Sequence, residues 1–295
     1  MNSKILNFYA SPGKFTNLGK YAKLQSIPSD LHEMVSMLQG NLIHEFAALP
    51  FYGVDATKEK REESHIRYAK SMVEKILNED SGSIDKKKKP EERLMGVCHH
   101  YSLLLTALLR SKKIPARVRY GFGSYFHEGY FEDHSICETW DSATQSWKLV
   151  DAQFDSIWQK QLKIRHDIFQ VPREKFLTPG LAWIKCRRGE LDPERFGIFQ
   201  GDLRGLWFLA GNIIKDIAAL NKMELLQWDA WGAMPRPNNQ MKDQKKLKFF
   251  DELAELSNHP DENFQEVKEV YDDKSKRIFI PERVFNAVKR HLENV

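Results

Sequence analysis

The sequence has few cysteines, no long apolar run and little excess charge. Only three of its 295 residues are cysteine, which predicts no disulfide framework and favours a reducing, cytoplasmic compartment. No stretch of about 18 or more apolar residues exists, and the N-terminus lacks the apolar segment of a signal peptide, so we expect no membrane contact. The formal net charge of +4 predicts no broad surface for nucleic acid.

The apolar content is nevertheless high enough for a large core. Hydrophobic residues make up 41% of the chain and aromatic residues 12%, which argues against a disordered chain. Apolar spacing typical of helices occurs in residues 28–49, 58–79, 98–112, 208–226, 243–257 and 281–293. Strand-like patterns occur in residues 117–126, 134–141 and 146–153, and the turn-forming residues between the last two predict a hairpin.

Four consecutive lysines, Lys86 to Lys89, lie in a predicted loop that runs from Ser81 to Pro90. A run of like charges in a loop usually belongs to a solvated surface, and we expect that here. The alternative is that the run attracts an acidic partner. Nucleic-acid binding through these lysines would show a strong dependence on salt.

Cys98 opens a strongly apolar predicted helix, directly after Gly96 and Val97. A free thiol has a pKa near ~8.5, and a helix N-terminus together with a nearby imidazolium lowers this pKa by several units. The first-turn N–H groups of such a helix can also bind a developing oxyanion. Taken alone, a cysteine in this place is usually a small buried hydrophobe. With a suitable base it is a nucleophile for acyl transfer.

Two downstream residues complete the pattern of a nucleophile site. His134 begins one predicted strand, and Asp151 lies near the end of the next. In the predicted hairpin, position 134 lies opposite about 153 and position 136 opposite about 151, so the two side chains fall within reach across the strand pair. The order Cys98, His134, Asp151 therefore predicts a thiol nucleophile, a general base and an acid that orients the imidazole.

A metal site is another interpretation of the same region. His99, His100, His134 and Cys137 are residue types that bind zinc. However, adjacent His99 and His100 diverge by about 100° on a helix, and His134 and Cys137 lie three apart on a strand and so face opposite sides. No CxxC pair accompanies them. We therefore expect neither a metal nor another cofactor.

Other side chains could assist or enclose such a site. An oxyanion donor besides the Cys98 backbone is expected from the first predicted helix. The candidates there are Gln39, Asn41 and His44. Gln153 returns to the face of Asp151 along its strand and is a candidate support. The segment with Trp228 and Trp231, close to a proline-rich break, is the expected cleft wall, although core packing is the usual role of such residues.

Several short segments occur in a recognisable combination over about residues 60 to 155. They are Gly96-Val97-Cys98, Leu108-Leu109-Arg110, Ile114-Pro115-Ala116-Arg117, Gly121, His134-Ser135-Ile136-Cys137-Glu138-Thr139-Trp140 and Trp147-Lys148-Leu149-Val150-Asp151. Together they resemble the transglutaminase-like superfamily, a branch of the papain-like thiol enzymes. A longer similarity, to a bacterial group of transglutaminase-like proteins, rests on motifs such as Ile43-His44-Glu45, Asp151-Ala152-Gln153 and Trp228-Asp229-Ala230-Trp231-Gly232.

The resemblance implies an α+β fold with a papain-like core, in which the nucleophile helix packs on an antiparallel sheet and additional helices surround it. It also implies one catalytic domain over residues 1–235, with its core at about 60–155, and a C-terminal helical appendage over residues 236–295.

The same resemblance implies Cys98 as nucleophile, His134 as base and Asp151 as orienting acid. At two points this sequence differs from the family's usual residues, and both differences concern which reaction is expected. Crosslinking transglutaminases usually have Trp where this chain has His99, and the bacterial group often has Arg-Asp where this chain has His99-His100. No calcium loop of the D-x-D-x-D-G type is present, so calcium activation is not implied.

We therefore expect an enzyme that attacks an amide carbonyl in a peptide, protein or other amide-containing substrate and passes through a thioester. Hydrolysis and transfer to an amine share every step up to the second nucleophile, so both stay open. The alternative is a non-catalytic protein-binding module that retains the fold. Neither a nucleic acid nor a membrane is an expected partner.

Overall fold

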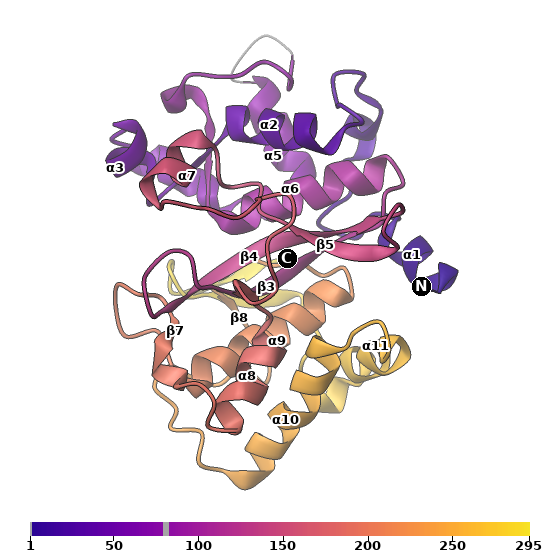
Figure 1. Cartoon of the computed structure of the whole chain (residues 1–295), viewed down its shortest axis with the longest axis vertical. Helices are drawn as coiled ribbons and strands as arrows, with labels where there is room; N and C mark the ends of the chain where they lie inside the picture. The colour runs from indigo at the N-terminus through magenta and orange to yellow at the C-terminus, as the bar shows by residue number, and fades with distance from the viewer. Residues whose placement is uncertain (1, 79–82) are drawn as a thin grey trace. The chain divides into compact units, whose positions relative to one another are not determined.

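The computed structural model describes residues 2–78 and 83–295 and divides into two compact units (Figure 1). The first unit comprises Met1–Val118 and Ile136–Val171, and the second Arg119–Ser135 and Pro172–Val295. Strands β3 (Ala116–Gly123) and β4 (Phe131–Asp141) each run through a boundary, so the division does not fall at one linker. The domain boundary expected near residue 235 lies inside the second unit and stays a prediction.

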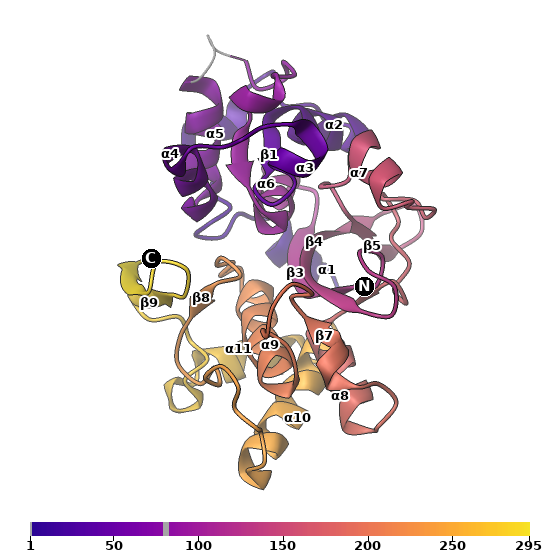
Figure 2. The same cartoon turned by 90° about the vertical axis from the view of Figure 1, so that its left-hand side faces the viewer.

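The first unit is built around helix α6 (Cys98–Ser111), which confirms the helix predicted over residues 98–112. Every residue from Cys98 to Arg110 is buried, as expected for a helix that is apolar on most sides. Helices α2 (Leu31–Asn41) and α5 (Ala69–Asn78) pack against α6 (Figure 2). The unit also contains α1 (Ser3–Tyr9), α3 (Ala48–Tyr52), α4 (Lys58–Arg61), β5 (Ser146–Val150) and α7 (Ser156–Gln161).

The first predicted helix, residues 28–49, is longer than the helix that the structure has there, α2. Helix α2 ends at Asn41, whose side-chain amide donates to the carbonyls of Met37 and Ile84 at 2.9 and 2.7 Å. The chain then forms strand β1 (Leu42–His44), which pairs in parallel with β2 (Leu94–Gly96). The apolar spacing continues through this segment, but pairing with a distant strand overrides the helical preference.

The second predicted helix, residues 58–79, is broken into α4, a 3₁₀ turn over Glu62–His65, and α5. The break turns Glu63 inward, where its carboxylate accepts the Met95 N–H at 2.9 Å and pairs with the Lys60 and Lys75 ammonium groups at 3.0 and 3.3 Å. A continuous helix would not bring this carboxylate to the backbone of β2. The break therefore allows Glu63 to bind β2, the strand that leads to Cys98.

The lysine loop is less solvated than predicted. Lys88 is buried, and its ammonium donates to the Ile76 carbonyl. A short 3₁₀ helix, Pro90–Glu92, follows directly. Ser81 and Gly82 of the predicted loop lie outside the described residues. One lysine of the four is thus a structural contact rather than part of an open positive surface.

Strands β4 and β5 form the predicted antiparallel hairpin in the predicted register. Cys137 lies opposite Val150, and Trp140 lies opposite Trp147. The second strand is shorter than expected and ends at Val150 rather than at residue 153. In the second unit, β3 pairs antiparallel with β6 (Phe176–Leu177) and β4 pairs with β7 (Phe196–Gly197).

The second unit is organised by α9 (Leu206–Leu220), the predicted helix of residues 208–226 with an earlier end. Helices α8 (Pro179–Arg187) and α10 (Gln244–Asn258) pack against it and against each other, and α11 (Phe264–Asp272) also contacts α9. Among the described residues, no helix is both long and apolar enough to cross a membrane.

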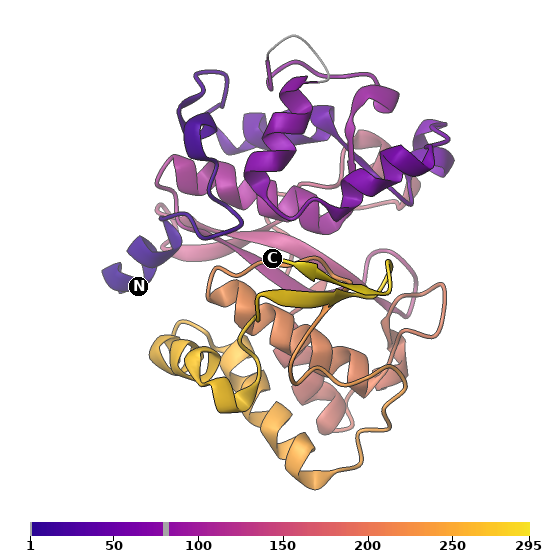
Figure 3. The same ribbon diagram turned by 180° about the vertical axis from the view of Figure 1, so that it is seen from behind.

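The helix predicted over residues 281–293 is wrong. This segment forms strands β9 (Arg283–Asn286) and β10 (His291–Asn294) (Figure 3), and β9 pairs with both β10 and β8 (Asp229–Ala230). The C-terminal segment is therefore not wholly helical. The Asn286 side chain accounts for the turn, since its Oδ1 accepts the N–H groups of Val288 and Lys289 at 3.1 and 3.0 Å.

A buried ion pair joins α9 to β3 within the second unit. The Arg119 guanidinium donates to Asp216 through Nε at 3.0 Å and Nη2 at 2.9 Å, and the same carboxylate accepts the Tyr120 N–H and the Ser257 hydroxyl. These four residues are all buried. Water therefore cannot stabilise the Arg119 and Asp216 charges, and each charge is stabilised by the other.

We predict that Asp216→Asn lowers the free energy of unfolding by about 3–5 kcal/mol, because it leaves the Arg119 charge buried without a counter-ion. Urea unfolding followed by tryptophan fluorescence measures this loss. Glu190→Gln is the matched control, because it breaks the exposed ion pair with Lys185 in the same unit and should change the midpoint far less. Equal effects of the two substitutions would contradict the prediction.

Candidate functional site

The start of α6 is fixed by contacts among Gly96, Val97 and His100. The His100 Nδ1 accepts the Val97 N–H at 3.1 Å, which satisfies a donor that the helix itself leaves open. A Cβ on Gly96 would lie 2.7 Å from the His100 ring, so the ring can approach only because residue 96 is glycine. Burial lowers the pKa of His100 to about 3, with a smaller contribution from His65, and the ring stays neutral as its acceptor role requires.

Cys98 is the first residue of α6 and is 7% exposed. No acidic residue lies in the first turn, so the partial positive charge of the helix N-terminus is not neutralised by a carboxylate there.

The pairing of β1 with β2 brings His44 to the segment that precedes Cys98. His44 lies opposite Gly96, and the Glu45 N–H donates to the Gly96 carbonyl at 2.8 Å. The His44 Nδ1 accepts the Phe46 N–H at 3.3 Å, and the ring packs edge to face on Trp158. Of the three upstream candidates, His44 is thus placed beside the nucleophile segment.

The other two upstream candidates lie on α2 and differ in what their amides bind. The Gln39 Nε2 donates to the Ala152 carbonyl at 3.3 Å, which brings this side chain to the segment of Asp151. The Asn41 amide uses both of its hydrogens on backbone carbonyls. Gln39 therefore supports the acid's segment, whereas Asn41 closes its helix.

Asp151 follows the last residue of β5 and is 1% exposed. Its backbone N–H donates to the Ile168 carbonyl at 2.8 Å, and its Oδ1 accepts the Gln153 N–H at 3.3 Å. This local turn fixes the carboxylate against its own backbone. Gln153 is also buried, and its side-chain oxygen has no hydrogen-bond partner among the described residues.

His134 lies on β4 in the second unit, one residue before Ser135, the last residue of this strand that belongs to the unit. It is 1% exposed. Aromatic rings surround it: Phe126, Tyr125 and Phe176 lie at centroid distances of 5.0, 6.1 and 6.3 Å, each steeply inclined to the imidazole. Ring edges of this kind hold an imidazole in one orientation.

Residues 52–152 match the family model described as Transglutaminase-like superfamily. This part of the chain is similar to the transglutaminase-like superfamily. The match contains Cys98, His134 and Asp151. A solved structure, that of a putative cysteine protease from Cytophaga hutchinsonii, is similar at 17% identity and a TM-score of 0.20, over 57% of this chain and 51% of that one. The chain thus covers about half of that protein. No curated protein matches the chain at a significant level.

The family match confirms the predicted α+β class, with a buried helix that opens on cysteine and an antiparallel hairpin downstream. It supports the papain-like thiol class for this part of the chain. Among the described residues, no group of three or more His, Cys, Asp or Glu side chains is arranged to hold a metal ion.

The two other thiols have environments unlike that of a reactive cysteine. Cys137 is fully buried, accepts the Thr106 hydroxyl at 3.3 Å, and has a pKa raised to about 12 by burial. Burial and the nearby Asp192 charge raise the pKa of Cys186 to about 12 as well. Neither thiol is ionised to a useful extent near neutral pH.

The predicted cleft wall is part of the second unit's own packing. Trp231 is buried, and its indole N–H donates to the Ile278 carbonyl at 2.9 Å. The neighbouring Asp229 accepts the Leu226 N–H at 3.1 Å. Trp228 is partly exposed and precedes β8 directly. The bond to Ile278 and the pairing of β8 with β9 tie the tryptophan segment to the C-terminal part of the second unit, and a role as cleft wall stays a prediction.

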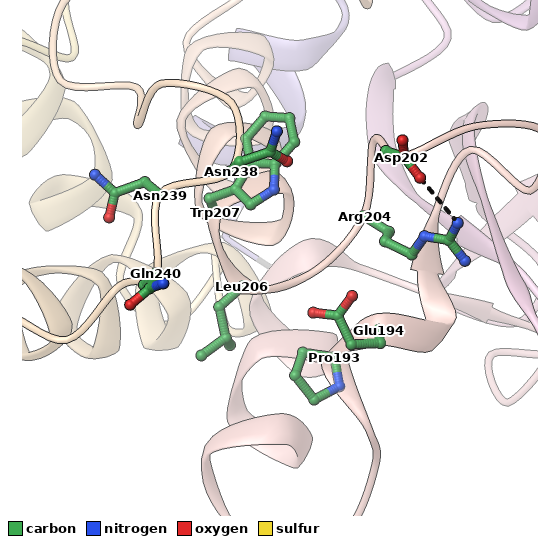
Figure 4. Close-up of a pocket in the computed structure, with 9 residues that line it drawn as sticks. All are labelled: Pro193, Glu194, Asp202, Arg204, Leu206, Trp207, Asn238, Asn239 and Gln240. Carbon is green, nitrogen blue, oxygen red and sulfur yellow. Dashed lines mark ion pairs between the residues drawn. The ribbon is translucent and has the colours of Figure 1, made fainter.

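A polar pocket of about 460 Å³ lies in the second unit (Figure 4). It is lined by Pro193, Glu194, Asp202, Arg204, Leu206, Trp207, Asn238, Asn239 and Gln240. Two of these lining residues, Asp202 and Arg204, form an ion pair of 3.5 Å. None of the three predicted catalytic residues lines this pocket.

Sequence reasoning missed the role of His100, which it treated only as a metal candidate and as a departure from related motifs. The available signal was spacing, because a side-chain acceptor at the third helical position can reach back to the N–H before the helix. It also missed the role of Glu63, whose carboxylate binds the backbone of a strand more than thirty residues away. No pattern in the neighbouring sequence predicts such a contact.

We predict that Gly96→Ala lowers the free energy of unfolding by about 1–3 kcal/mol, because the added Cβ overlaps the His100 ring. It should also slow alkylation of Cys98 by displacing the start of α6. Gly211→Ala is the control, since a Cβ there meets nothing within 4 Å and alanine stabilises a helix interior by up to about 1 kcal/mol. Thermal unfolding and thiol labelling measure both effects, and an unchanged Gly96→Ala protein would contradict the packing argument.

Proposed function

We propose that the protein is a thiol-dependent enzyme that opens amide bonds through Cys98, His134 and Asp151. The observation that carries the proposal is Cys98 at the N-terminus of a buried helix inside the region that is similar to the transglutaminase-like superfamily. The matched region also contains the histidine and the acid that such a reaction needs.

The proposed reaction has two halves. The Cys98 sulfur attacks the amide carbonyl carbon while its proton passes to His134, and the resulting oxyanion binds the N–H of Cys98 and other first-turn donors. The tetrahedral intermediate then breaks its C–N bond, and the imidazolium returns the proton to the departing amine. A thioester on Cys98 and a free amine remain.

The second half restores the thiol. Water or an amine gives a proton to His134 and attacks the thioester carbonyl, and the C–S bond breaks as the sulfur regains that proton. With water the product is an acid, and with an amine it is a new amide. Both outcomes use the same residues, so the proposed substrate class is a peptide, a protein or another amide-containing molecule.

Asp151 would orient the imidazole and stabilise its charged form. Support for this role comes from its burial and from the hydrogen bond that pins its carboxylate to the Gln153 N–H. Gln39, bonded to the Ala152 carbonyl, would steady this segment from α2. His44, beside Gly96, is the upstream side chain best placed to assist the oxyanion.

We predict that iodoacetamide at pH 8 labels Cys98 first and leaves Cys137 and Cys186 almost unmodified. A pKa of about 12 leaves roughly one thiolate in 10⁴ for those two residues at this pH. Peptide mass spectrometry measures the labelling of each site. His134→Gln should slow only the Cys98 reaction. Slow, equal labelling of all three would favour the alternative, a non-catalytic binding module that keeps the fold.

We predict that an electrophilic acyl probe labels the wild-type protein and not Cys98→Ala. Asp151→Asn should reduce the rate of labelling by about 10²–10⁴-fold, because the imidazole loses its orienting acid. Cys186→Ser is the matched control and should label normally. Retained labelling in Cys98→Ala would assign the reactive group elsewhere and end the proposal. Adding an amine to the acylated protein then separates transfer from hydrolysis by the product released.

A further inference from the structure

The polar pocket of the second unit combines hydrogen-bond donors and acceptors with one aromatic ring (Figure 4). Asn238, Asn239 and Gln240 contribute three consecutive side-chain amides, and each amide both donates and accepts. Trp207 contributes a flat ring and an indole N–H, which only donates. The volume of about 460 Å³ lies within the range of small-molecule sites, about 300–1,000 Å³.

One wall of the pocket includes a short 3₁₀ helix over Pro193–Arg195. The Asp192 Oδ1 accepts the Glu194 N–H at 3.0 Å and caps this helix. A Cβ on Gly205 would lie 2.7 Å from the Glu194 Oε1, so the absence of a side chain at residue 205 leaves the carboxylate the space that it occupies. The φ of Gly205 is +95°, a conformation that also favours glycine.

The loop with the three amides forms another part of the lining. Asn238 has a φ of +60°, a left-handed conformation that asparagine tolerates in turns. The Asn239 Oδ1 accepts the Met241 N–H at 2.9 Å, and the Met241 side chain is buried. Met241 therefore anchors the loop that carries the amides of Asn238 and Gln240.

The charges of the lining do not suit an anion. Asp202 and Arg204 form an ion pair, and the Arg204 guanidinium also donates to the Gly201 carbonyl at 2.7 Å. Glu194 adds a second carboxylate, so the lining has two negative groups and one positive group. An anionic ligand would be repelled. An apolar ligand would remove these polar groups from water without replacing their hydrogen bonds.

A cation satisfies the lining less well than a neutral hydroxylated ligand does. An ammonium group donates hydrogen bonds and cannot accept them. It would bind the Glu194 carboxylate but leave the amide and indole N–H groups of the same pocket without acceptors, at a cost in free energy. A hydroxyl both donates and accepts, so it suits the carboxylate, the amides and the indole alike.

Neighbouring hydroxyls and an apolar ring face distinguish a saccharide from a peptide. Two hydroxyls on adjacent carbons can donate to the two oxygens of one carboxylate, such as that of Glu194. On one side of an extended peptide, successive N–H groups lie about 7 Å apart, too far for this arrangement. The C–H face of a pyranose ring also packs on an aromatic ring. Phe208 packs on the Trp207 indole at a centroid distance of 5.4 Å and an angle of 88°, which holds the indole in one orientation.

We propose that this pocket binds a neutral saccharide. The Trp207 ring packs on the C–H face of one sugar ring, and the Glu194 carboxylate accepts from two neighbouring hydroxyls. The amides of Asn238 and Gln240 bind further hydroxyls of the ligand. Saccharide binding here does not depend on the proposed function, because none of the proposed catalytic residues lines the pocket.

Binding is tested on the full chain with four neutral probes: maltohexaose, cellohexaose, mannohexaose and chitohexaose. Saturation-transfer NMR detects binding, and tryptophan fluorescence gives the dissociation constant. We expect at least one probe to bind with little dependence on salt, because the ligand carries no charge. Binding of none of the four at millimolar concentration overturns the proposal. Tighter binding of spermine or of hexaalanine than of every saccharide also overturns it, in favour of a cation or a peptide.

Two substitutions test whether the probe occupies this pocket. Trp207→Ala should weaken binding about tenfold or more, because the sugar loses the ring on which it packs. Glu194→Gln should weaken binding by a similar factor, because a carboxylate accepts hydrogen bonds more strongly than an amide does. Glu190→Gln is the matched control, since Glu190 is exposed and lies outside the pocket.

Circular dichroism of each variant separates lost binding from lost folding. Trp207→Phe keeps an aromatic face and should retain most of the affinity, so it replaces Trp207→Ala as the comparison if the alanine variant unfolds. Unchanged affinity in both Trp207→Ala and Glu194→Gln overturns the proposal, and so does an equal loss in Glu190→Gln. Labelling of Cys98 by an acyl probe is measured separately, and its failure would end the proposed function without affecting saccharide binding.

Discussion

Burial of α6 on all sides is the constraint on which the first unit depends. A helix removed from water must find partners inside the protein for the backbone groups at its ends. At its start, His100 accepts the Val97 N–H, and β1 binds the strand that leads into the helix. At its end, the Ile114 N–H returns to the Leu109 carbonyl. These contacts leave the first turn rigid, which is the condition for a nucleophile at that turn to be held in one geometry.

Charges buried in either unit are stabilised by contacts of more than one kind. In the first unit, the Arg117 Nε lies 2.6 Å from Glu138, and the guanidinium stacks on Trp147 at 4.1 Å from the ring centroid. In the second, Asp216 collects four donors, two of them from Arg119. Removal of a charge from water is expensive, and only such multiple partners offset the loss of hydration. These pairs therefore fix strand β3 at two points along its length.

Local patterns were enough to predict α6 and the β4–β5 hairpin with its register. In both cases the apolar periodicity and the turn residues lie within about fifteen residues of each other. The parallel pairing of β1 with β2 could not be predicted in this way, because Leu42 meets Leu94 across fifty residues. The helix predicted where the C-terminal hairpin lies was wrong for a related reason. Val284 and Val288 fit a helical stripe, yet Val284 is buried in a strand and Val288 is exposed.

The candidate site shows the same difference between local patterns, which can be read from the sequence, and long-range contacts, which cannot. Cys98 and Asp151 were predicted because a helix start and a strand end are visible in the chain, and the described geometry around each is compatible with its proposed role. The contacts that hold them were not predicted. The Gln39 amide reaches Ala152 from a helix more than a hundred residues upstream, and Ile168 binds the Asp151 backbone from a loop beyond β5. Such supports depend on tertiary packing, which a single sequence does not display.

The position of Asp151 is set as much by the far end of its hairpin as by its own contacts. In the turn, Asp141 accepts the Ala143 N–H at 2.8 Å and the Thr144 hydroxyl at 3.0 Å, and it pairs with Lys148. A slip of one residue in the register would turn every side chain of β5 to the opposite face. The turn contacts oppose that slip. They lower the pKa of Asp141 to about 2, so their contribution is complete above the ordinary aspartate pKa and is lost as the pH falls toward 2. Ordinary carboxylates, with pKa values near ~4, are protonated first, so acid weakens these turn contacts only at the low-pH end of the titration.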